Sequence, residues 1–297
     1  MSSFTYDVAC VGQAVIDCIA RDVTGDPSKD RVCRAREVGI STGGDAMNEG
    51  SVLAKLGRSV RLVCGLGFDT AGNFIMSEAG RRGLDTSHVT QVDWLATPVT
   101  QLLLREEPDR STVNSEASKL VGYVPSPDDI AGARVVSLAS LFRAPHDAPE
   151  KILPLARRAK EQGSILVADT KKPNFDGMHP SELSELWPLL DWIFPNESEA
   201  ELYTGHKDPA QAAAALRAMG VRNVVVKCGP EGVVVDCEQG KLAYPARKVK
   251  VVDTTGAGDN FVAGFITGLL DGCDVRECCE RGTEQASKTV QHVGATQ

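Results

Sequence analysis

Asp259 directly follows a glycine turn, Gly256-Ala257-Gly258, and an apolar helical pattern begins immediately after it. The first turn of a helix has free backbone N–H groups and the positive end of the helix dipole, and glycines allow an anion to approach both. The turn is therefore predicted to bind a phosphoryl group. The carboxylate of Asp259 could accept the proton of an attacking hydroxyl group, although an acidic residue in a first turn can also serve only to stabilise the helix dipole.

A second glycine turn, Gly43-Gly44, precedes another predicted helix, and Asn48 lies in the first turn of that helix. A closely approaching backbone and an amide that both donates and accepts hydrogen bonds suit a ligand with many hydroxyl groups. On these residues alone, a plain loop followed by a helix-start residue remains open. Asp17 follows Gly12 and the first predicted strand, a position where an aspartate is usually a solvated turn residue.

Two pairs of polar residues follow predicted strands. Lys171 and Lys172 could contact phosphate, on a nucleotide or on a phosphorylated substrate, although adjacent lysines in a loop are usually solvated. Asn196 and Glu199 have the spacing of a helix capping box, which explains them in structural terms.

Strands and helices alternate along the chain. Apolar runs predict strands at 6–11, 60–64, 134–138, 165–169, 192–194, 223–228 and 233–236, and helical periodicity predicts helices at about 147–161, 181–186, 197–203 and 275–293. This alternation is typical of an α/β fold with a doubly wound, mostly parallel sheet and helices on both faces, which binds ligands at the carboxyl ends of its strands. Val249 and Val251–Val252 predict the end of one more strand. Residues at about 18–40 and 95–115 predict strands of a small accessory sheet.

The composition disfavours several classes of protein. The 297 residues include 40 Asp and Glu against 32 Lys and Arg, a net charge of −8, which disfavours nucleic acid or an anionic membrane as the main partner. Neither a signal-peptide pattern nor a run of about 18 apolar residues occurs, so a cytoplasmic location without membrane association is expected. No Walker A sequence is present, and Thr70 replaces the third glycine of a dinucleotide fingerprint.

The run Asp253-Thr-Thr-Gly-Ala-Gly-Asp259 resembles, nearly letter for letter, the C-terminal signature of the ribokinase (phosphofructokinase B, PfkB) family of carbohydrate kinases. Gly43-Gly44 with Asn48 and the Leu56-Gly57 helix end resembles the N-terminal signature of that family, although Met47 stands where the family usually has Ala. The resemblance implies one ribokinase-like kinase domain over residues 1–297, in which the accessory strands form a β-sheet lid over the sugar and often a dimer contact.

The resemblance also implies an activity and a role for each site residue. The enzyme would transfer the γ-phosphoryl group of ATP to a hydroxymethyl group of a small sugar, with Mg²⁺ and, as a second cation, K⁺. The implied residues are Asp259 as general base with Gly256, Ala257 and Gly258 as anion hole; Asp17, Gly43, Gly44, Asn48 and Asp259 around the sugar; Lys227, Gly229, Gly232, Gly256 and Gly258 around the nucleotide; Asn196 and Glu199 around Mg²⁺ through water; and the backbone carbonyls of Asp253 and Thr255 around K⁺.

Three other functions remain open. A nucleoside kinase would share the fold and these motifs, but it would need an apolar or aromatic slot in the lid, where aromatic residues are scarce. A sugar-phosphate kinase would use Lys171 and Lys172 for the phosphate of its substrate. A sugar-binding sensor without catalysis is disfavoured by the intact Asp259, Asn196 and Glu199.

The choice of sugar and the oligomeric state stay undetermined. Ser137–Ser140 has no carboxylate where some ribose-specific relatives place a sugar-binding Glu, so ribose is not the first substrate expected. The lid can close over its own site or pair with that of a second copy, which leaves a homodimer open.

Overall fold

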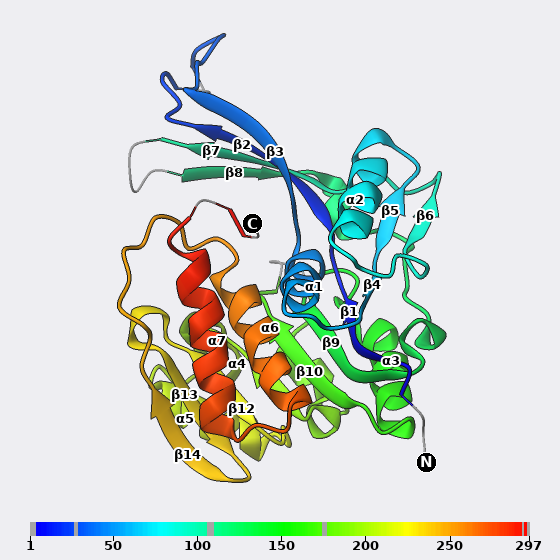
Figure 1. Ribbon diagram of the computed structural model, residues 1–297, viewed down its shortest axis with the longest axis vertical. Helices are drawn as coiled ribbons and strands as arrows, with labels where there is room; N and C mark the ends of the chain where they lie inside the picture. The colour runs from blue at the N-terminus through cyan, green and yellow to red at the C-terminus, as the bar shows by residue number, and fades with distance from the viewer. Residues whose placement is uncertain (1–3, 27–28, 106–109, 174–176, 293, 296–297) are drawn as a thin grey trace.

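An eight-stranded sheet forms the centre of the computed structural model, which describes residues 4–26, 29–105, 110–173, 177–292 and 294–295 (Figure 1). Its strands are β1 Tyr6–Val11, β4 Val60–Val63, β9 Ala133–Leu141, β10 Ile165–Thr170, β11 Trp192–Phe194, β12 Val224–Lys227, β13 Val233–Cys237 and β14 Gly240–Tyr244. They lie in the order β14-β13-β12-β11-β10-β9-β1-β4. The neighbours from β12 to β4 pair in parallel, whereas β13 and β14 are antiparallel and close one edge.

Helices cover both faces of this sheet. They are α1 Asp45–Lys55, α2 Thr70–Arg81, α3 Pro149–Glu161, α4 Glu197–Thr204, α5 Pro209–Ala218, α6 Ala257–Leu270 and α7 Val275–Thr289. Because successive side chains of a strand point to opposite faces, Val8 and Cys10 of β1 enter the core shared with α1, α2, α6 and α7, and Ala9 and Val11 enter the core shared with α3, α4 and α5. This arrangement confirms the predicted doubly wound α/β fold.

A second sheet of four strands stands at the end of the molecule where α6 begins (Figure 1). Its strands are β2 Val15–Arg21, β3 Glu37–Gly43, β7 Val99–Leu104 and β8 Arg110–Asn114, in the order β3-β2-β7-β8. We call it the lid sheet. It is joined directly to the candidate site, because β3 ends at Gly43 and α1 starts at Asp45. A two-stranded sheet, β5 Gly65–Gly67 with β6 Thr90–Val92, lies beside α2.

The strand predicted at 249–252 is wrong. No strand occurs between Tyr244 and α6; instead, the backbone N–H of Val252 donates to the carbonyl of Val290 over 2.7 Å, so this segment lies along the end of α7. Val251 and Val252 remain exposed by 58% and 43%. Alternating valines thus indicate a strand only where a neighbouring strand accepts their backbone hydrogen bonds.

The helix predicted at 181–186 is also wrong. A short 3₁₀ helix, Pro180–Leu183, stands there, with His179 and Glu182 forming a capping box at its start. A second 3₁₀ helix, Trp187–Leu189, follows it, and Pro188 within this helix has no N–H to donate, so the chain does not continue as an α-helix. Helix α5 and strand β14 have no counterpart among the sequence predictions. Helix α7 ends at Thr289; its predicted end, Val293, lies outside the described residues.

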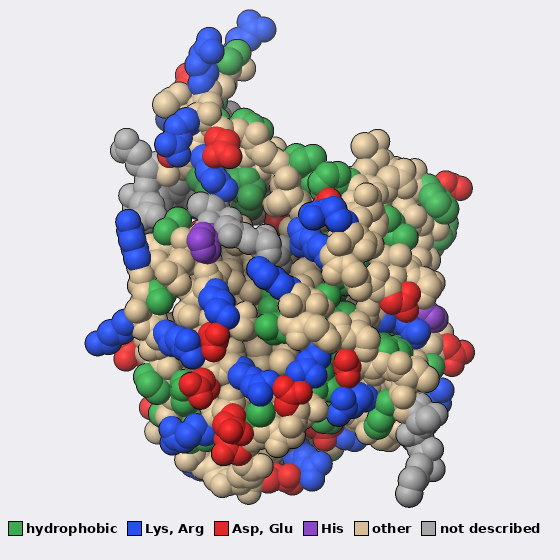
Figure 2. Space-filling view, in the orientation of Figure 1, with side chains coloured by type: hydrophobic (Ala, Val, Ile, Leu, Met, Phe, Trp, Pro, Cys, Tyr) green, Lys and Arg blue, Asp and Glu red, His purple; other side chains and the backbone are tan. Residues whose placement is uncertain are grey.

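The helical face of the molecule carries charges of both signs. Lys and Arg side chains are interspersed with Asp and Glu over α6 and α7 (Figure 2), and Glu284 on α7 pairs with both Lys288 and Arg247. Within the described ranges, no helix has the length and apolar character needed to cross a membrane.

Candidate active site

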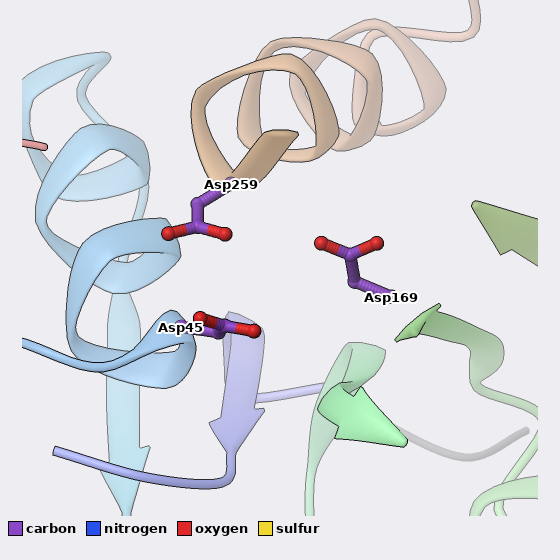
Figure 3. Close-up of side chains that lie close together, drawn as sticks. All are labelled: Asp45, Asp169 and Asp259. Carbon is purple, nitrogen blue, oxygen red and sulfur yellow. The ribbon is translucent and has the colours of Figure 1, made fainter. Parts of the chain in front are cut away.

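Three aspartates from distant parts of the chain meet where the parallel strands end (Figure 3). Asp259 lies in the first turn of α6, Asp169 near the end of β10, and Asp45 at the first residue of α1. One carboxylate oxygen of each lies within 4.8 Å of the others, and all three side chains are buried. Buried like charges at this separation require protonation or cationic partners. We call these residues the aspartate cluster.

The glycine turn before Asp259 forms the start of α6 as predicted. Gly256 is the N-cap residue and has left-handed backbone geometry (φ +74°), and a side chain there would collide with Ala295. The side-chain amide of Asn260 secures the turn, because its Nδ2 donates to the carbonyls of Gly256 and Ala295, both over 2.8 Å. A Cβ at Gly258 would lie 3.1 Å from Lys227 Nζ. The helix start therefore combines main-chain N–H groups with an ammonium group, both of which attract an anion.

Asp259 has the electrostatic properties of a proton acceptor near neutral pH. Burial is the main cause that raises the pKa of Asp259, to about 7, and the carboxylates of Asp45 and Asp169 add to it. The Lys171 ammonium and the hydrogen bond from Asn48 act in the opposite direction. A carboxyl group with this pKa changes protonation state within the physiological range, as a general base requires.

Asn48 lies directly against Asp259, although 211 residues separate the two positions. Its Nδ2 donates to Asp259 Oδ2 over 2.7 Å, and its buried Oδ1 has no hydrogen-bond partner in the described part of the chain. Gly44, the N-cap of α1, has φ +88°, and a Cβ there would lie 2.5 Å from the carbonyl oxygen of Gln13. The predicted N-terminal glycine turn therefore places Asn48, with its unpaired acceptor Oδ1, beside Asp259.

Asp17 and Gly43 are neighbours in the lid sheet. A side chain at Gly43 would overlap the carboxylate of Asp17, which would have to move from its present position. At Gly12, a Cβ would approach the carbonyl oxygen of Ala139 to 2.6 Å, which explains glycine between the ends of β1 and β9. The structure thus places Asp17 beside the turn that leads to Asn48.

Lys227 forms a buried ion pair with Asp169. Its Nζ lies 2.5 Å from Asp169 Oδ1, and the two side chains are 14% and 1% exposed. Burial disfavours the ammonium form, but the carboxylates of Asp169 and Glu199 outweigh burial and raise the pKa of Lys227. Lys227 therefore stays charged beside Gly258 at the start of α6.

Asn196 and Glu199 form the predicted capping box at the start of α4. The backbone N–H of Asn196 donates to Glu199 Oε2, and that of Glu199 donates to Asn196 Oδ1, both over 2.9 Å. Glu199 Oε2 also accepts from Thr170 Oγ1 over 2.9 Å. Burial raises the pKa of Glu199, against the effect of Lys227.

The turn from Gly229 to Gly232 begins two residues after Lys227. Both glycines have left-handed backbone geometry, with φ +51° and +96°, and the N–H of Cys228 donates to the carbonyl of Gly232 over 2.7 Å. A Cβ at Gly232 would collide with the carbonyl of Tyr244. The turn is therefore a tight main-chain loop at the end of β12, on the Lys227 side of the site.

Asp253 anchors the loop before α6. Its Oδ1 accepts from the N–H and the hydroxyl of Thr255, over 2.9 and 2.7 Å, and its Oδ2 accepts from the N–H of Gly294 over 2.9 Å. The carboxylate therefore shapes the loop and ties it to the segment after α7. The carbonyls implied for K⁺ belong to this loop.

The two lysines after β10 have different surroundings. Lys171 Nζ lies 3.2 Å from Asp45 Oδ2, and this carboxylate is the main cause that raises the pKa of Lys171, assisted by Asp259 and Asp169. Lys172 is exposed, and among the described residues no ion pair or hydrogen bond joins its side chain to the aspartate cluster. Nothing in the sequence distinguished the two lysines, whereas in the structure Lys171 lies at the aspartate cluster and Lys172 is exposed.

Sequence reasoning missed Asp45, Glu49 and their serine partners. Ser140 Oγ donates to Asp45 Oδ2, and Ser137 Oγ donates to Glu49 Oε2, both over 2.6 Å. Complete burial raises the pKa of Glu49 well above its ordinary range, and the carboxylate of Asp169 adds to this effect. The spacing of Asp45 and Glu49 could have indicated them. Two acidic residues one helical turn apart repel each other unless tertiary contacts compensate.

The aspartate cluster has the ligand atoms for a hard cation, but ammonium groups already lie against it. Lys171 faces Asp45 and Lys227 faces Asp169, which offsets the charge of two of the three carboxylates. Asp259 remains as the carboxyl group whose proton can be exchanged. The arrangement can therefore take a proton from a hydroxyl group held beside Asn48, in front of an anion-binding helix start.

Comparisons with known proteins cover almost the whole chain. The family model described as pfkB family carbohydrate kinase matches residues 5–297. The ribokinase of Haemophilus influenzae is 27% identical over 265 residues, covering 86% of this chain and 83% of the relative. The cytidine kinase of Thermococcus kodakarensis is 28% identical over 258 residues, covering 85% and 88%. The solved structure of Arabidopsis thaliana ribokinase complexed with ribose and ATP has a TM-score of 0.83 at 25% identity, covering 98% of this chain and 94% of that one.

Proposed function

Because this chain belongs to the pfkB family of carbohydrate kinases, we propose that it transfers the γ-phosphoryl group of ATP to a hydroxymethyl group of a small sugar, with Asp259 as general base. The chain is an ATP-dependent sugar kinase. We propose the hydroxymethyl group as the acceptor and the roles of the residues described below. The observation that carries it is the buried carboxyl group of Asp259, with a pKa of about 7, between Asn48 and the start of α6.

The acceptor would lie between the lid sheet and Asp259. Asn48 Oδ1 is a buried acceptor that a substrate hydroxyl can fill, and Asp17 stands on the lid sheet beside Gly43. Leaving Asn48 Oδ1 unpaired is unfavourable, and a bound hydroxyl removes that cost. Asp259 would then take the proton of the attacking hydroxyl as its oxygen approaches the phosphorus.

The triphosphate would lie along the start of α6. The N–H groups that follow Gly256 and the Lys227 ammonium beside Gly258 would stabilise the charge on the transferred group. The turn from Gly229 to Gly232 offers further main-chain contacts at the end of β12. We propose that these glycines and Lys227 bind the nucleotide.

We propose that two cations, Mg²⁺ and K⁺, assist the transfer. Glu199, buried beside Thr170, and Asn196 would act on Mg²⁺ through the waters that this ion retains. When bound, Mg²⁺ would offset the charge of the triphosphate. The loop of Asp253 and Thr255, fixed through Gly294, could hold K⁺ by its carbonyls.

ATP turnover across a panel of acceptors tests the proposed function. A coupled assay with Mg²⁺ and K⁺, each omitted in turn, would compare free ketoses and aldoses, their phosphates, and nucleosides. Turnover on free sugars is the expected outcome. Turnover restricted to nucleosides or to sugar phosphates would contradict the proposed acceptor, and phosphorylation of none of these compounds would contradict the kinase assignment.

A nucleoside kinase is the second candidate, because the cytidine kinase of Thermococcus kodakarensis matches most of the chain. A nucleobase is usually held by an aromatic or apolar slot. The strands β2, β3, β7 and β8 contain no Phe, Tyr or Trp, so the lid sheet itself offers no aromatic surface for stacking. We therefore place sugars ahead of nucleosides.

The rate of phosphoryl transfer should rise with pH through about 7. Asp259 must be ionised to accept a proton, and its pKa is raised to about 7, so the active fraction grows as pH increases and levels off above that value. Measuring kcat between about pH 5 and 9 with saturating substrates would show this limb. A profile of kcat that stays flat through pH 7 would contradict the role of Asp259. As a control, ADP added at each pH should be converted fast enough to show that the coupling enzymes do not limit the measured rate.

We further propose that the chain acts as one kinase domain with the lid strands inserted, and that the lid sheet supports a homodimer. Val38, Ile40 and Val113 on its strands are exposed by 70%, 59% and 61%. Exposed apolar residues gathered on one sheet are typical of a contact surface.

A further inference from the structure

We infer that Asp45 determines substrate specificity: its carboxylate, held by Ser140 and Lys171, binds hydroxyl groups of an uncharged acceptor next to the reacting one and disfavours a phosphorylated acceptor. The inference rests on the proposed function, because it assumes that Asp259 is the general base and therefore contacts the hydroxyl group that reacts. It adds a residue that no motif identified, and it narrows the class of substrate.

The carboxylate of Asp45 is directed across the site. An aspartate at the first residue of a helix commonly stabilises the helix N-terminus or faces solvent. Here the side chain is buried, and its Oδ2 accepts from Ser140 Oγ over 2.6 Å and lies 3.2 Å from Lys171 Nζ. Figure 3 shows Asp45 beneath Asp259, with carboxylate oxygens of the cluster within 4.8 Å of one another. A small ligand held by Asp259 would therefore also reach Asp45.

Two backbone irregularities bring the partners of Asp45 into place. Ser140 has left-handed geometry (φ +68°), which is unfavourable for a residue with a side chain. The pairing of β9 with β10 shifts register between Ala168 and Thr170, and the N–H of Lys171 then donates to the carbonyl of Leu141 over 3.0 Å. Register shifts of this kind re-aim side chains near functional sites. Both irregularities lie at the strand ends that supply Ser140 and Lys171.

The charges favour hydroxyl groups over a phosphate. Lys171 is paired with Asp45, and Lys227 with Asp169, so a phosphate at Asp45 would have to displace a carboxylate from its ammonium partner. It would also lie beside the carboxyl group of Asp259, whose ionised form would repel it. A hydroxyl group instead donates to a carboxylate in a charge-assisted hydrogen bond without moving either lysine.

Asp45→Asn tests the inference, because it keeps the shape of the side chain but removes the charge. Asp147→Asn is the matched control: Asp147 also pairs with a lysine, with Lys151 Nζ 2.8 Å from its Oδ1, but it lies just before α3 and outside the aspartate cluster. Ser140→Ala keeps both charges and removes only the hydroxyl group that orients Asp45. Circular dichroism and melting temperature would establish that each variant is folded.

The readouts are kcat and KM for the best free sugar and for its phosphate. Asp45→Asn should raise KM for the free sugar by about tenfold or more, as expected for a lost charge-assisted hydrogen bond, with a smaller change in kcat. It should also raise the ratio of kcat/KM for the phosphate to that for the free sugar by about tenfold. Ser140→Ala should change KM in the same direction by less. An ion pair with a merely structural role would leave the selectivity ratio unchanged.

Calorimetric binding of the free sugar and its phosphate separates this inference from the proposed function. If the wild type binds free sugars without transferring phosphate to them, and Asp45→Asn loses that binding, the proposed function fails while the inference stands. The inference is overturned if Asp45→Asn behaves like Asp147→Asn in KM and in selectivity. It is also overturned if the wild type binds the phosphorylated sugar more tightly than the free one, or binds neither.

Discussion

Asp259→Asn should lower kcat by roughly two to four orders of magnitude, the usual contribution of a general base, and leave acceptor binding largely intact. The amide keeps the size of the carboxylate and can still accept the hydrogen bond from Asn48 Nδ2, which is 2.7 Å long in the native protein. It cannot take up the proton of the attacking hydroxyl at neutral pH. Steady-state kinetics with ATP and the preferred sugar would measure kcat, and calorimetry would measure sugar affinity separately.

Asp93→Asn is the control for that variant, because Asp93 is exposed and lies in the turn after β6, outside the proposed site. Its kcat should match that of the wild type. If Asp259→Asn turned over at a rate close to the wild type, another group would have to receive the proton. The start of α6, where we propose that the transferred phosphoryl group binds, would then be the main catalytic feature.

Lys227→Met should destabilise the protein by about 3–5 kcal/mol, the range observed when one partner of a buried ion pair is removed. Asp169 is 1% exposed, and Lys227 Nζ lies 2.5 Å from its Oδ1, so the carboxylate would lose its cation with no access to water. Glu199 would lose the same neighbouring charge. The variant should also bind ATP more weakly, because the ammonium beside Gly258 is removed. Urea unfolding would give the stability, and the KM for ATP would report nucleotide binding.

A double variant distinguishes an unpaired charge from lost packing. Adding Asp169→Leu to Lys227→Met should recover part of the stability, because no buried carboxylate then remains unpaired at that position. Lys207→Met, on the exposed segment after α4, should leave the free energy of unfolding unchanged. A loss below about 1 kcal/mol in Lys227→Met would show that the ion pair contributes no more than an exposed one does.

Local sequence patterns predicted the architecture well. The strand at 6–11 is the observed β1, and a helix start at Gly256 to Asp259 agrees with α6 at Ala257–Leu270, since apolar periodicity and glycine turns act over a few residues. Local patterns gave a wrong strand at 249–252, where the valines have no neighbouring strand to pair with. They also gave a wrong helix at 181–186, where a capping box starts only a 3₁₀ helix.

Part of the site was equally local. Asn48 and Asp259 each follow a glycine turn at the start of a helix. Both could be predicted from the sequence, because adjacent residues form the helix start that positions each side chain. The capping box of Asn196 and Glu199 is another case: its two hydrogen bonds connect residues three positions apart.

The sequence by itself thus determined the α/β class and the glycine turns, and it predicted Asp259 as the general base. Only the tertiary structure decided which other groups surround it. Ser140 reaches Asp45 across 95 residues and Lys227 reaches Asp169 across 58. Of the two adjacent lysines, only Lys171 meets a carboxylate in the part of the chain that the structure describes. Such contacts depend on strand order and on the register of β9 against β10, which arise from packing of the whole sheet and leave no periodic trace in the chain.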